Sequence, residues 1–293
     1  MTPMDVSTTD ALRAAAGLIV LGLAAYAWLI EPSNIQVTER EIEIPRLPDS
    51  LDGLTICHLS DLHLRGFRHL ERRLVDKLQG REVDLCLITG DFISGARGIK
   101  HVGRVLSGLK ARYGTYGVYG NAEHRFLRSD LPIAEILAAQ GVRMLINQHD
   151  LLTINGCEVL IAGVDDPFTA RDDPDGALAG TGTAVLRILL AHSPDVVKDL
   201  REEIPDLILS GHTHGGQVRL PLAGAIWLHC RHSGLNICHG YYGPEQLSRA
   251  AGRDLSPARM YLPRGIGGRV RARFLCRPEV AFLTLRKTRP RNR

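Results

Sequence analysis

The sequence lacks the cysteine spacing of a small domain held by disulfides or zinc, and it lacks the strong positive charge of a nucleic-acid-binding protein. No two cysteines have the Cys-x-x-Cys spacing, and most of them lie inside apolar stretches, so we interpret them as small buried hydrophobic residues in a reducing compartment. The six are Cys57, Cys86, Cys157, Cys230, Cys238 and Cys276. Charge of one sign is also scarce, with a formal net charge of +4 over 293 residues, and we therefore expect no nucleic-acid partner.

The small positive excess gathers at the end of the chain. Residues 286–293 include Arg286, Lys287, Arg289, Arg291 and Arg293, and we expect them to form a basic tail. A solvated, frayed terminus is the simplest interpretation. A basic face that meets anionic lipid is the alternative.

One long apolar run lies near the start. Residues 14–30 carry no charge and end just after Trp28, which is close to the ~20 residues needed to cross a bilayer. We expect residues 1–32 to form a single-pass membrane anchor. A cleaved secretory signal is the alternative, but Asp5 and Asp10 against Arg13 make a poor signal start. Basic residues on the two sides of the run do not decide its orientation.

Polar residues follow the first strands of the next region. After a linker over residues 33–53, which includes an edge strand at 36–44, an apolar strand ends in Asp61-Leu62-His63. Residues 70–78 have helical spacing of leucines, and a second apolar run over 83–89 leads to Asp91. Carboxyl ends of strands are where open α/β sheets place their sites, although Asp91 could instead cap the next segment.

The pattern repeats further along the chain. An apolar-periodic segment over 102–109 precedes a strand that ends in Gly120-Asn121, and a helix is expected over 131–139. Short strands are expected at 144–146, 151–154 and 159–163, with Asn155-Gly156 as a hairpin turn. A strand over 187–191 leads to His192.

The most specific block follows an apolar run over residues 207–209. It reads Gly211-His212-Thr213-His214-Gly215-Gly216-Gln217. Strand-like alternation would place the side chains of His212 and His214 on one side, where they can reach the same point, and glycines leave room for a substrate. Two histidines in a surface turn are the simpler interpretation of this block alone.

Taken together, these motifs resemble one enzyme family. Asp-x-His, Gly-Asp, Gly-Asn, His and Gly-His-x-His, in that order, are similar to the calcineurin-like metallophosphoesterases over residues 54–285. The resemblance implies an α/β fold, a layered metallophosphoesterase-type β-sandwich flanked by helices, here preceded by one N-terminal transmembrane helix. Residues 261–267, 273–274 and 276–279 resemble the C-terminal block of the membrane-associated bacterial branch, which includes UDP-2,3-diacylglucosamine pyrophosphohydrolases of lipid A synthesis.

The same resemblance implies two divalent metal ions, for which manganese, iron and zinc all fit the ligands. One ion would be held by Asp61, His63, Asp91 and His214, and the other by Asp91, Asn121, His192 and His212, with Asp91 bridging. Two such cations activate a water and offset charge on the phosphoryl group. The family usually has a histidine directly after the asparagine, but Ala122 stands there, and His124 is the candidate replacement as a catalytic acid.

We therefore expect hydrolysis of a phosphodiester or pyrophosphate bond in a lipid-linked substrate such as UDP-2,3-diacylglucosamine, at the bacterial inner membrane with the catalytic domain on the cytoplasmic side. Three alternatives remain. They are a phosphodiesterase or phosphatase for a soluble substrate, a nuclease, and a metal-binding scaffold without turnover, which Ala122 suggests.

Overall fold

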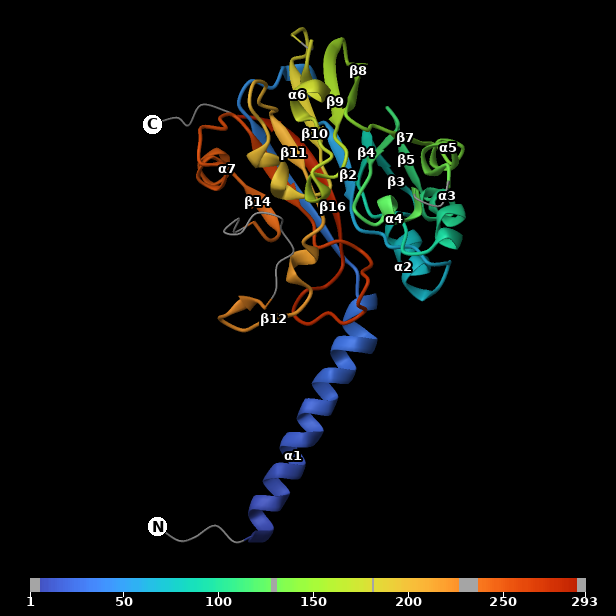
Figure 1. The fold of residues 1–293 in the computed structure, drawn as a ribbon, viewed down its shortest axis with the longest axis vertical. Helices are drawn as coiled ribbons and strands as arrows, with labels where there is room; N and C mark the ends of the chain where they lie inside the picture. Colours follow the sequence, from blue (N-terminus) through green and yellow to red (C-terminus); the bar gives the residue numbers. More distant parts are fainter. Residues whose placement is uncertain (1–5, 128–130, 181, 227–236, 289–293) are drawn as a thin grey trace.

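The computed structural model describes residues 6–127, 131–180, 182–226 and 237–288, and Cys230 and Arg289, Arg291 and Arg293 lie outside them. Two six-stranded sheets form the body of the molecule (Figure 1). The first has the order β1-β16-β2-β4-β6-β7, with β1 at Gln36–Ile44, β2 at Thr55–Leu59, β4 at Leu85–Thr89, β6 at Thr115–Val118, β7 at Val142–Met144 and β16 at Glu279–Lys287. The second has the order β14-β15-β11-β10-β9-β8, with β8 at Gln148–Ile154, β9 at Cys157–Gly163, β10 at Leu186–Leu190, β11 at Leu207–Leu209, β14 at Gly240–Tyr242 and β15 at Arg259–Leu262.

The two sheets pack face to face through one apolar core. Ile56, Leu87 and Val118 of the first sheet belong to the same buried cluster as Ile161 and Ile188 of the second. Because each central strand is also covered on its outer face, nearly all of its residues are buried and its sequence does not alternate apolar with polar residues. The sequence therefore predicts the strands, but it does not tell which side chains of each strand face the other sheet.

Helices cover the outer face of each sheet (Figure 1). Helices α2 (His69–Leu78), α3 (Val102–Leu106) and α5 (Ile133–Ala138) pack on the first sheet, and α6 (Pro174–Leu178) and α7 (Pro244–Ala251) pack on the second. In α2 the four-residue spacing of Leu74 and Leu78 buries both side chains against the sheet. The expected layered α/β sandwich is confirmed.

The N-terminal segment is a helix that projects away from this body (Figure 1). It consists of α1 (Val6–Ala25), a π-helical turn at Tyr26–Ile30 and a 3-10 turn at Glu31–Ser33. Thr9–Ser33 is long and apolar enough to cross a membrane by length and composition, with mean hydropathy 1.8 and 6% of the apolar window buried. The expected membrane helix is thus present as a candidate span.

The base of this helix is held by the loop before β16. The backbone N–H of Arg273 donates to the Ala27 carbonyl, and that of Cys276 donates to the Glu31 carboxylate. Glu31 is 1% exposed. The last helical residues are therefore part of the globular body.

Several expected boundaries were wrong. The run 83–89 is two strands, β3 (Arg81–Val83) and β4, because the Asp84 carboxylate accepts hydrogen bonds from the Thr55 backbone N–H and hydroxyl and interrupts the pairing. The segment 102–109 is helical only to Leu106, and Leu109 begins β5 (Leu109–Ala111). The strand expected at 144–146 is β7, which starts earlier, directly after Gly141.

The C-terminal region also differs from the expected tail. Arg286 and Lys287 belong to β16 and pair with Glu41 and Asp49, at 2.8 and 2.7 Å. The interpretation of these two residues as part of a frayed terminus was therefore wrong. Residues 36–44 do form the expected edge strand, which pairs with β16. Asn155 and Gly156 both have positive φ, as the predicted hairpin turn requires.

Candidate metal centre

Seven candidate ligands meet where strands of both sheets end. Asp61 and His63 follow β2, and Asp91 and Asn121 follow β4 and β6. His192 follows β10, and His212 and His214 follow β11. Because β2, β4 and β6 are parallel, and β10 and β11 are parallel, their carboxyl ends lie at one edge of each sheet.

Five of these residues have a left-handed backbone, a conformation that is uncommon outside glycine. Their φ angles are 52° at Asp61, 47° at His63, 51° at Asp91, 71° at His212 and 50° at His214. The sequence-based reason for the convergence, strand-like alternation, was therefore wrong. The strands stop before the ligands, and the turns aim the side chains.

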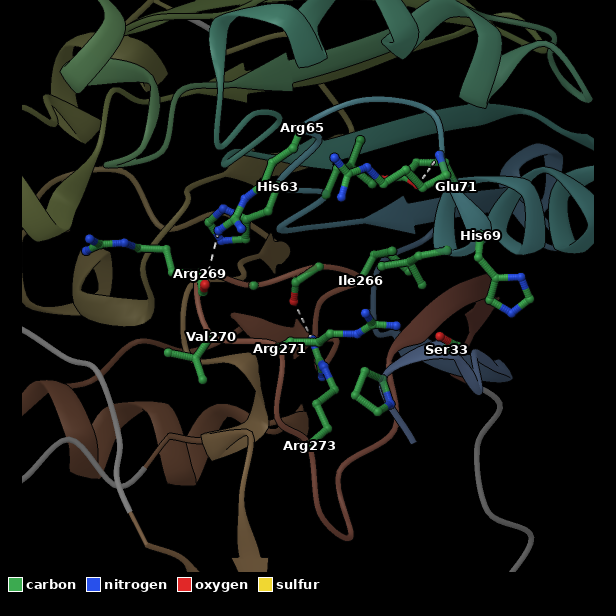
Figure 2. A pocket seen from close by; sticks show the side chains of 16 residues that line it. Ser33, His63, Arg65, His69, Glu71, Ile266, Arg269, Val270, Arg271 and Arg273 are labelled. Atoms are coloured by element: carbon green, nitrogen blue, oxygen red, sulfur yellow. Dashed lines mark hydrogen bonds between the residues drawn. The ribbon is translucent and has the colours of Figure 1, made fainter. Parts of the chain in front are cut away.

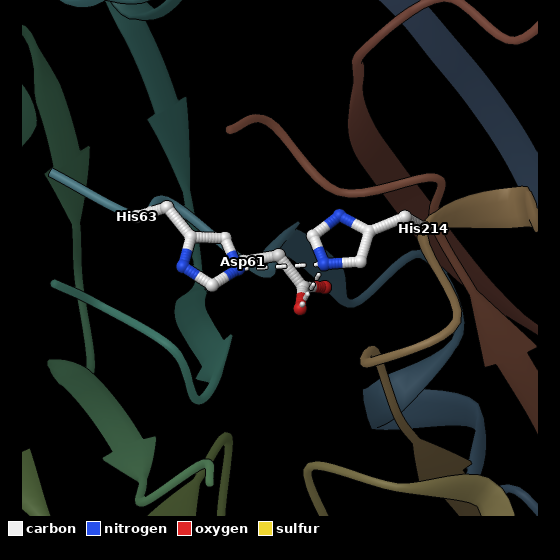
Figure 3. A group of neighbouring side chains, drawn as sticks. All are labelled: Asp61, His63 and His214. Carbon is white, nitrogen blue, oxygen red and sulfur yellow. Dashed lines mark hydrogen bonds and ion pairs between the residues drawn. The ribbon is translucent and has the colours of Figure 1, made fainter. Parts of the chain in front are cut away.

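The first group comprises Asp61, His63 and His214 (Figure 3). His214 Nε2 lies 3.4 Å from Asp61 Oδ1 and 3.4 Å from His63 Nε2, and the two imidazole rings are stacked. His63 Nε2 also lies 3.2 Å from Asp91 Oδ2. Two imidazole nitrogens and two carboxylate oxygens therefore face one small volume.

The second group comprises Asp61, Asp91 and His192. His192 Nε2 lies 3.5 Å from Asp91 Oδ1, 3.3 Å from Asn121 Oδ1 and 3.1 Å from His212 Nδ1. Thus His212 faces the second group while His214 faces the first. The expectation that the pair reaches a single point was wrong, but the division of the two histidines between two ions fits the geometry.

Hydrogen bonds from outside the groups orient the rings of two histidines. The Thr89 carbonyl can only accept, so His192 Nδ1 donates to it over 2.8 Å, and Nε2 is the nitrogen that faces Asp91. His63 Nδ1 is held by the Ser94 hydroxyl at 2.7 Å, and its Nε2 faces inward. Both rings are oriented as metal-ligating histidines usually are.

The buried charges are those of a cation site. Burial raises the pKa of Asp91 to about 6, and the neighbouring Asp61 carboxylate acts in the same direction. Burial lowers the pKa of His63 well below its usual value, with His214 adding to the effect. Asp61 Oδ1 is buried and accepts no hydrogen bond from the described residues. An inner carboxylate oxygen without a hydrogen-bond donor, beside the imidazole of His63, fits a divalent metal.

Glycines let other segments approach the Asp61 carboxylate closely. A Cβ at Gly265 would lie 2.8 Å from the Asp61 Cβ, and one at Gly211 would lie 2.8 Å from its Oδ2. Oδ2 accepts hydrogen bonds from the Ser60 hydroxyl at 2.6 Å and the His212 backbone N–H at 3.1 Å. Oδ1 is left facing the imidazoles.

Sequence reasoning missed Glu123, which holds the backbone of the two loops that carry Asp91 and Asn121. Its fully buried carboxylate accepts backbone hydrogen bonds from Asp91, Gly120 and Ile93, at 2.9, 2.9 and 3.2 Å. Burial, followed by the charge of Asp91, raises the pKa of Glu123 to about 8. The signal was available, because an acid two residues after Asn121 belongs to the family pattern.

His124 points at a different partner. It lies in α4 (Glu123–Leu127), and its Nε2 lies 2.6 Å from Asp165 Oδ1, in the loop after β9. Its ring packs edge-on against Tyr119. At the position of the usual family histidine, the Ala122 backbone N–H donates to Asp91 Oδ1 over 2.7 Å.

The five cysteines that the structure describes are all free, and Cys57, Cys86 and Cys276 are buried. This agrees with their interpretation as small apolar residues. Cys157 and Cys238 are half-buried.

The sequence is similar to several known proteins. The chain is 30% identical to an uncharacterized metallophosphoesterase, YkuE of Bacillus subtilis, over 94% of each chain. It is 29% identical to phosphodiesterase YaeI of Escherichia coli, over 81% of this chain and 84% of the relative. It is 25% identical to UDP-2,3-diacylglucosamine pyrophosphatase LpxG of Chlamydia trachomatis, over 90% and 94%.

The profile of one family, described as Metallophos, calcineurin-like phosphoesterase, matches residues 54–216. That range contains all seven candidate ligands together with Glu123 and His124. Members of this family are hydrolases that use divalent metals. The chain belongs to the calcineurin-like phosphoesterase family of metal-dependent hydrolases.

Proposed function

We propose that the protein hydrolyses a phosphodiester or pyrophosphate bond in a lipid-linked substrate, with two divalent metal ions. The observation that carries this proposal is the pair of ligand groups that lie beside one another at the sheet edge and that Asp91 joins, with Oδ2 3.2 Å from His63 Nε2 and Oδ1 3.5 Å from His192 Nε2. One group of ligands would hold a single structural ion. Two adjoining groups can hold two ions, which would stabilise the attacking and the leaving oxygen of an in-line displacement at phosphorus.

In this proposal Asp61, His63, Asp91 and His214 hold one ion, and Asp91, Asn121, His192 and His212 hold the other. Asp91 bridges, since its Oδ2 faces His63 and its Oδ1 faces His192. The ions, which manganese, iron or zinc could supply, would lower the pKa of a water and offset phosphoryl charge. The protein orients the ligands through Ser94, Thr89 and Glu123.

We further propose that His124 donates a proton to the leaving group. Asp165 orients the imidazole of His124, because Asp165 Oδ1 lies 2.6 Å from its Nε2. The alternative is a scaffold that binds metal without turnover, which Ala122 still suggests. The other alternative is a soluble phosphodiester or phosphomonoester as substrate.

A lipid-linked substrate is supported by the candidate membrane helix and by the LpxG relatives, which are named for a lipid-linked nucleotide. We divide the chain accordingly into an anchor at residues 1–32, a linker and edge strand at 33–53, and a catalytic domain that begins at residue 54 and continues to 287, because Arg286 and Lys287 belong to β16. The basic tail is then limited to residues 288–293. The bacterial inner membrane, with the catalytic domain on the cytoplasmic side, is the location we propose.

The test is an assay of the purified, manganese-loaded full chain against UDP-2,3-diacylglucosamine, phospholipids, nucleotides and a nitrophenyl phosphodiester. We expect the highest kcat/KM for a lipid-linked phosphodiester or pyrophosphate. A preference for nucleotides or monoesters would contradict the lipid assignment. Binding of metal with no turnover of any compound would favour the scaffold.

A further inference from the structure

A pocket of about 310 Å³ lies between the base of the N-terminal helix and the candidate metal centre (Figure 2). One wall is formed by Pro32 and Ser33 at the end of the helix. The opposite wall includes His63, one of the candidate ligands. The pocket therefore adjoins both the proposed membrane anchor and the proposed reaction site.

Four arginines with exposed side chains line this pocket. They are Arg65, Arg68, Arg269 and Arg271. The lining contains one acid, Glu71, and its carboxylate is occupied by the Arg68 backbone N–H at 2.7 Å. Across the described part of the chain, no carboxylate lies within ion-pair distance of these four guanidinium groups. Such clustered, uncompensated arginines favour a phosphate-bearing ligand.

A fifth arginine has a different role. Arg273 is 2% exposed and donates to the carbonyls of Arg264, Gly265 and Gly267. It thereby fixes the loop that carries Arg269 and Arg271. The same loop reaches the metal centre, because the Gly267 backbone N–H donates to the Asp61 carbonyl over 2.7 Å. The pocket is thus built on a loop held at both ends.

Apolar side chains lie in the pocket and on a hairpin at the same end of the body. Leu70 and Ile266 line the pocket, and Val270, between Arg269 and Arg271, is 56% exposed. Strands β12 (Arg219–Leu220) and β13 (Gly224–Ala225) form a hairpin. Three apolar side chains in or next to it are exposed, namely Leu220 (47%), Leu222 (110%) and Ile226 (60%). This hairpin lies at the same end of the body as the helix (Figure 1). Exposed apolar side chains beside a candidate membrane span favour contact with a bilayer.

The position of Trp28 places the pocket near the lipid headgroups. Tryptophan is enriched at the membrane interface, and Pro32 and Ser33 follow Trp28 by only four and five residues. At about 1.5 Å per helical residue, this separation is roughly 6 to 8 Å. Phosphates of a lipid in the same leaflet would lie at that level.

We propose that this arginine pocket is the subsite through which an anionic membrane lipid enters from the bilayer, its phosphate held by Arg65, Arg269 and Arg271 and its apolar part lying along Val270 and the hairpin. The inference rests on the proposed function in one respect, namely that the ligand is the lipid-linked substrate. Binding itself requires no turnover and is tested separately.

The binding experiment uses the full chain in detergent, treated with EDTA so that no metal recruits the phosphate. Dioctanoyl phosphatidic acid, dioctanoyl phosphatidylcholine and inorganic phosphate are titrated, and bound ligand is counted by native mass spectrometry. We expect phosphatidic acid to bind best. The variant Arg269→Gln/Arg271→Gln should raise its Kd about tenfold, the equivalent of ~1.4 kcal/mol.

The matched control is Arg72→Gln/Arg249→Gln, which removes two exposed arginines on α2 and α7 outside the pocket. It should bind like the wild type. An equal Kd for wild type and the pocket variant, or an equal loss in the control, would overturn the proposal. Inorganic phosphate binding as tightly as phosphatidic acid would show a plain anion site and overturn the lipid assignment.

The kinetic arm uses the metal-loaded chain. The pocket variant should lower kcat/KM for the lipid-linked substrate about tenfold more than for a small nitrophenyl diester, mainly through KM. If both substrates are hydrolysed but lose rate equally, the entry subsite is wrong and the proposed function stands. If neither is hydrolysed, the proposed function fails, and the binding experiment still decides whether the pocket takes a lipid.

Discussion

Left-handed backbone at five candidate ligands shows how single residues build this centre. An αL residue other than glycine costs roughly 1 to 3 kcal/mol and persists only where the surroundings impose it. Here hydrogen bonds impose it, for example from the backbone N–H of His63 to the Asp91 carbonyl at 2.8 Å and from Asp61 to the Gly90 carbonyl at 3.1 Å. The loops after β2 and β4 are therefore bound to each other, and strain in one is supported by the other.

Replacing the proposed bridging carboxylate tests the division of ligands. We expect Asp91→Ala to abolish turnover and to remove both metals, because both of its oxygens face candidate ligand nitrogens. Asn121→Ala should weaken only the ion beside His192. Metal content by mass spectrometry and kcat/KM on a nitrophenyl diester are the measurements. Two retained metals and a near-normal rate in Asp91→Ala would refute the bridging role.

His124 tests whether a displaced histidine acts as the acid. We expect His124→Ala to lower kcat by ~10² to 10⁴ for an alkyl ester and to matter little for a nitrophenyl ester, whose leaving group needs no proton. Asp165→Asn should move both rates in the same direction more weakly, since Asp165 holds the imidazole at Nε2. Small, equal effects of His124→Ala on both esters would exclude the proton-donor role.

Particular residues show what the sequence could and could not predict. Every strand that carries a candidate ligand was expected, because a buried strand followed by a polar residue is a local pattern. The family pattern could have marked Glu123, but not its role as a support, because its three partners are backbone groups of Asp91, Gly120 and Ile93, which folding brings together. The arginines of the pocket were missed for the same reason, since they lie in two segments about 200 residues apart in the sequence.

At the scale of elements, the N-terminal helix has two parts with different roles. Val6–Ala25 projects from the body, whereas Ala27 and Glu31 accept hydrogen bonds from the loop that contains Arg273 and Cys276. The apolar run in the sequence marked the helix but not this change of role, because burial of Glu31 depends on a loop some 240 residues later.

Two truncations separate these roles. Removal of residues 1–25 should release the protein from membranes and leave the thermal midpoint and hydrolysis of a small diester nearly unchanged. Removal of residues 1–33 should also lower the midpoint by several degrees, because it takes away the Glu31 and Ala27 acceptors. Fractionation and thermal unfolding are the measurements. Full-length protein in the soluble fraction with an intact N-terminus would contradict the anchor.

At the scale of the whole molecule, the centre joins the two halves of the sandwich. Asp61, His63, Asp91 and Asn121 come from the first sheet, and His192, His212 and His214 from the second. Two carboxylates and the Glu123 carboxyl are buried together at this junction. Without a cation their mutual repulsion opposes the packing of sheet on sheet, so metal binding and global stability are coupled.

The pH dependence of stability measures that coupling. The pKa of Glu123 is raised to about 8, first by burial, and although burial lowers the pKa of His192, the carboxylates of Asp91, Asp61 and Asp166 raise it to about 9. A group whose pKa is higher in the folded state binds more protons there, so its contribution to stability is lost as pH rises through the folded value. Burial lowers the pKa of His58 to about 3 and that of His63 well below its usual value. Their contributions to the free energy of unfolding are therefore lost only as pH falls below about 6.5.

Between pH 7 and 9 both Glu123 and His192 lose their protons, and both changes lower the free energy of unfolding as pH rises. We expect the thermal midpoint of the EDTA-treated protein to fall as pH rises from 7 to 9, and that of the manganese-loaded protein to fall less, because cations offset the carboxylate charge and bind deprotonated ligands. The difference between the two midpoints should widen with pH, and Glu123→Gln should flatten the metal-free curve. Calorimetry at three pH values provides the measurement, and parallel curves for the two forms would show that metal binding and the protonation of this centre are not linked.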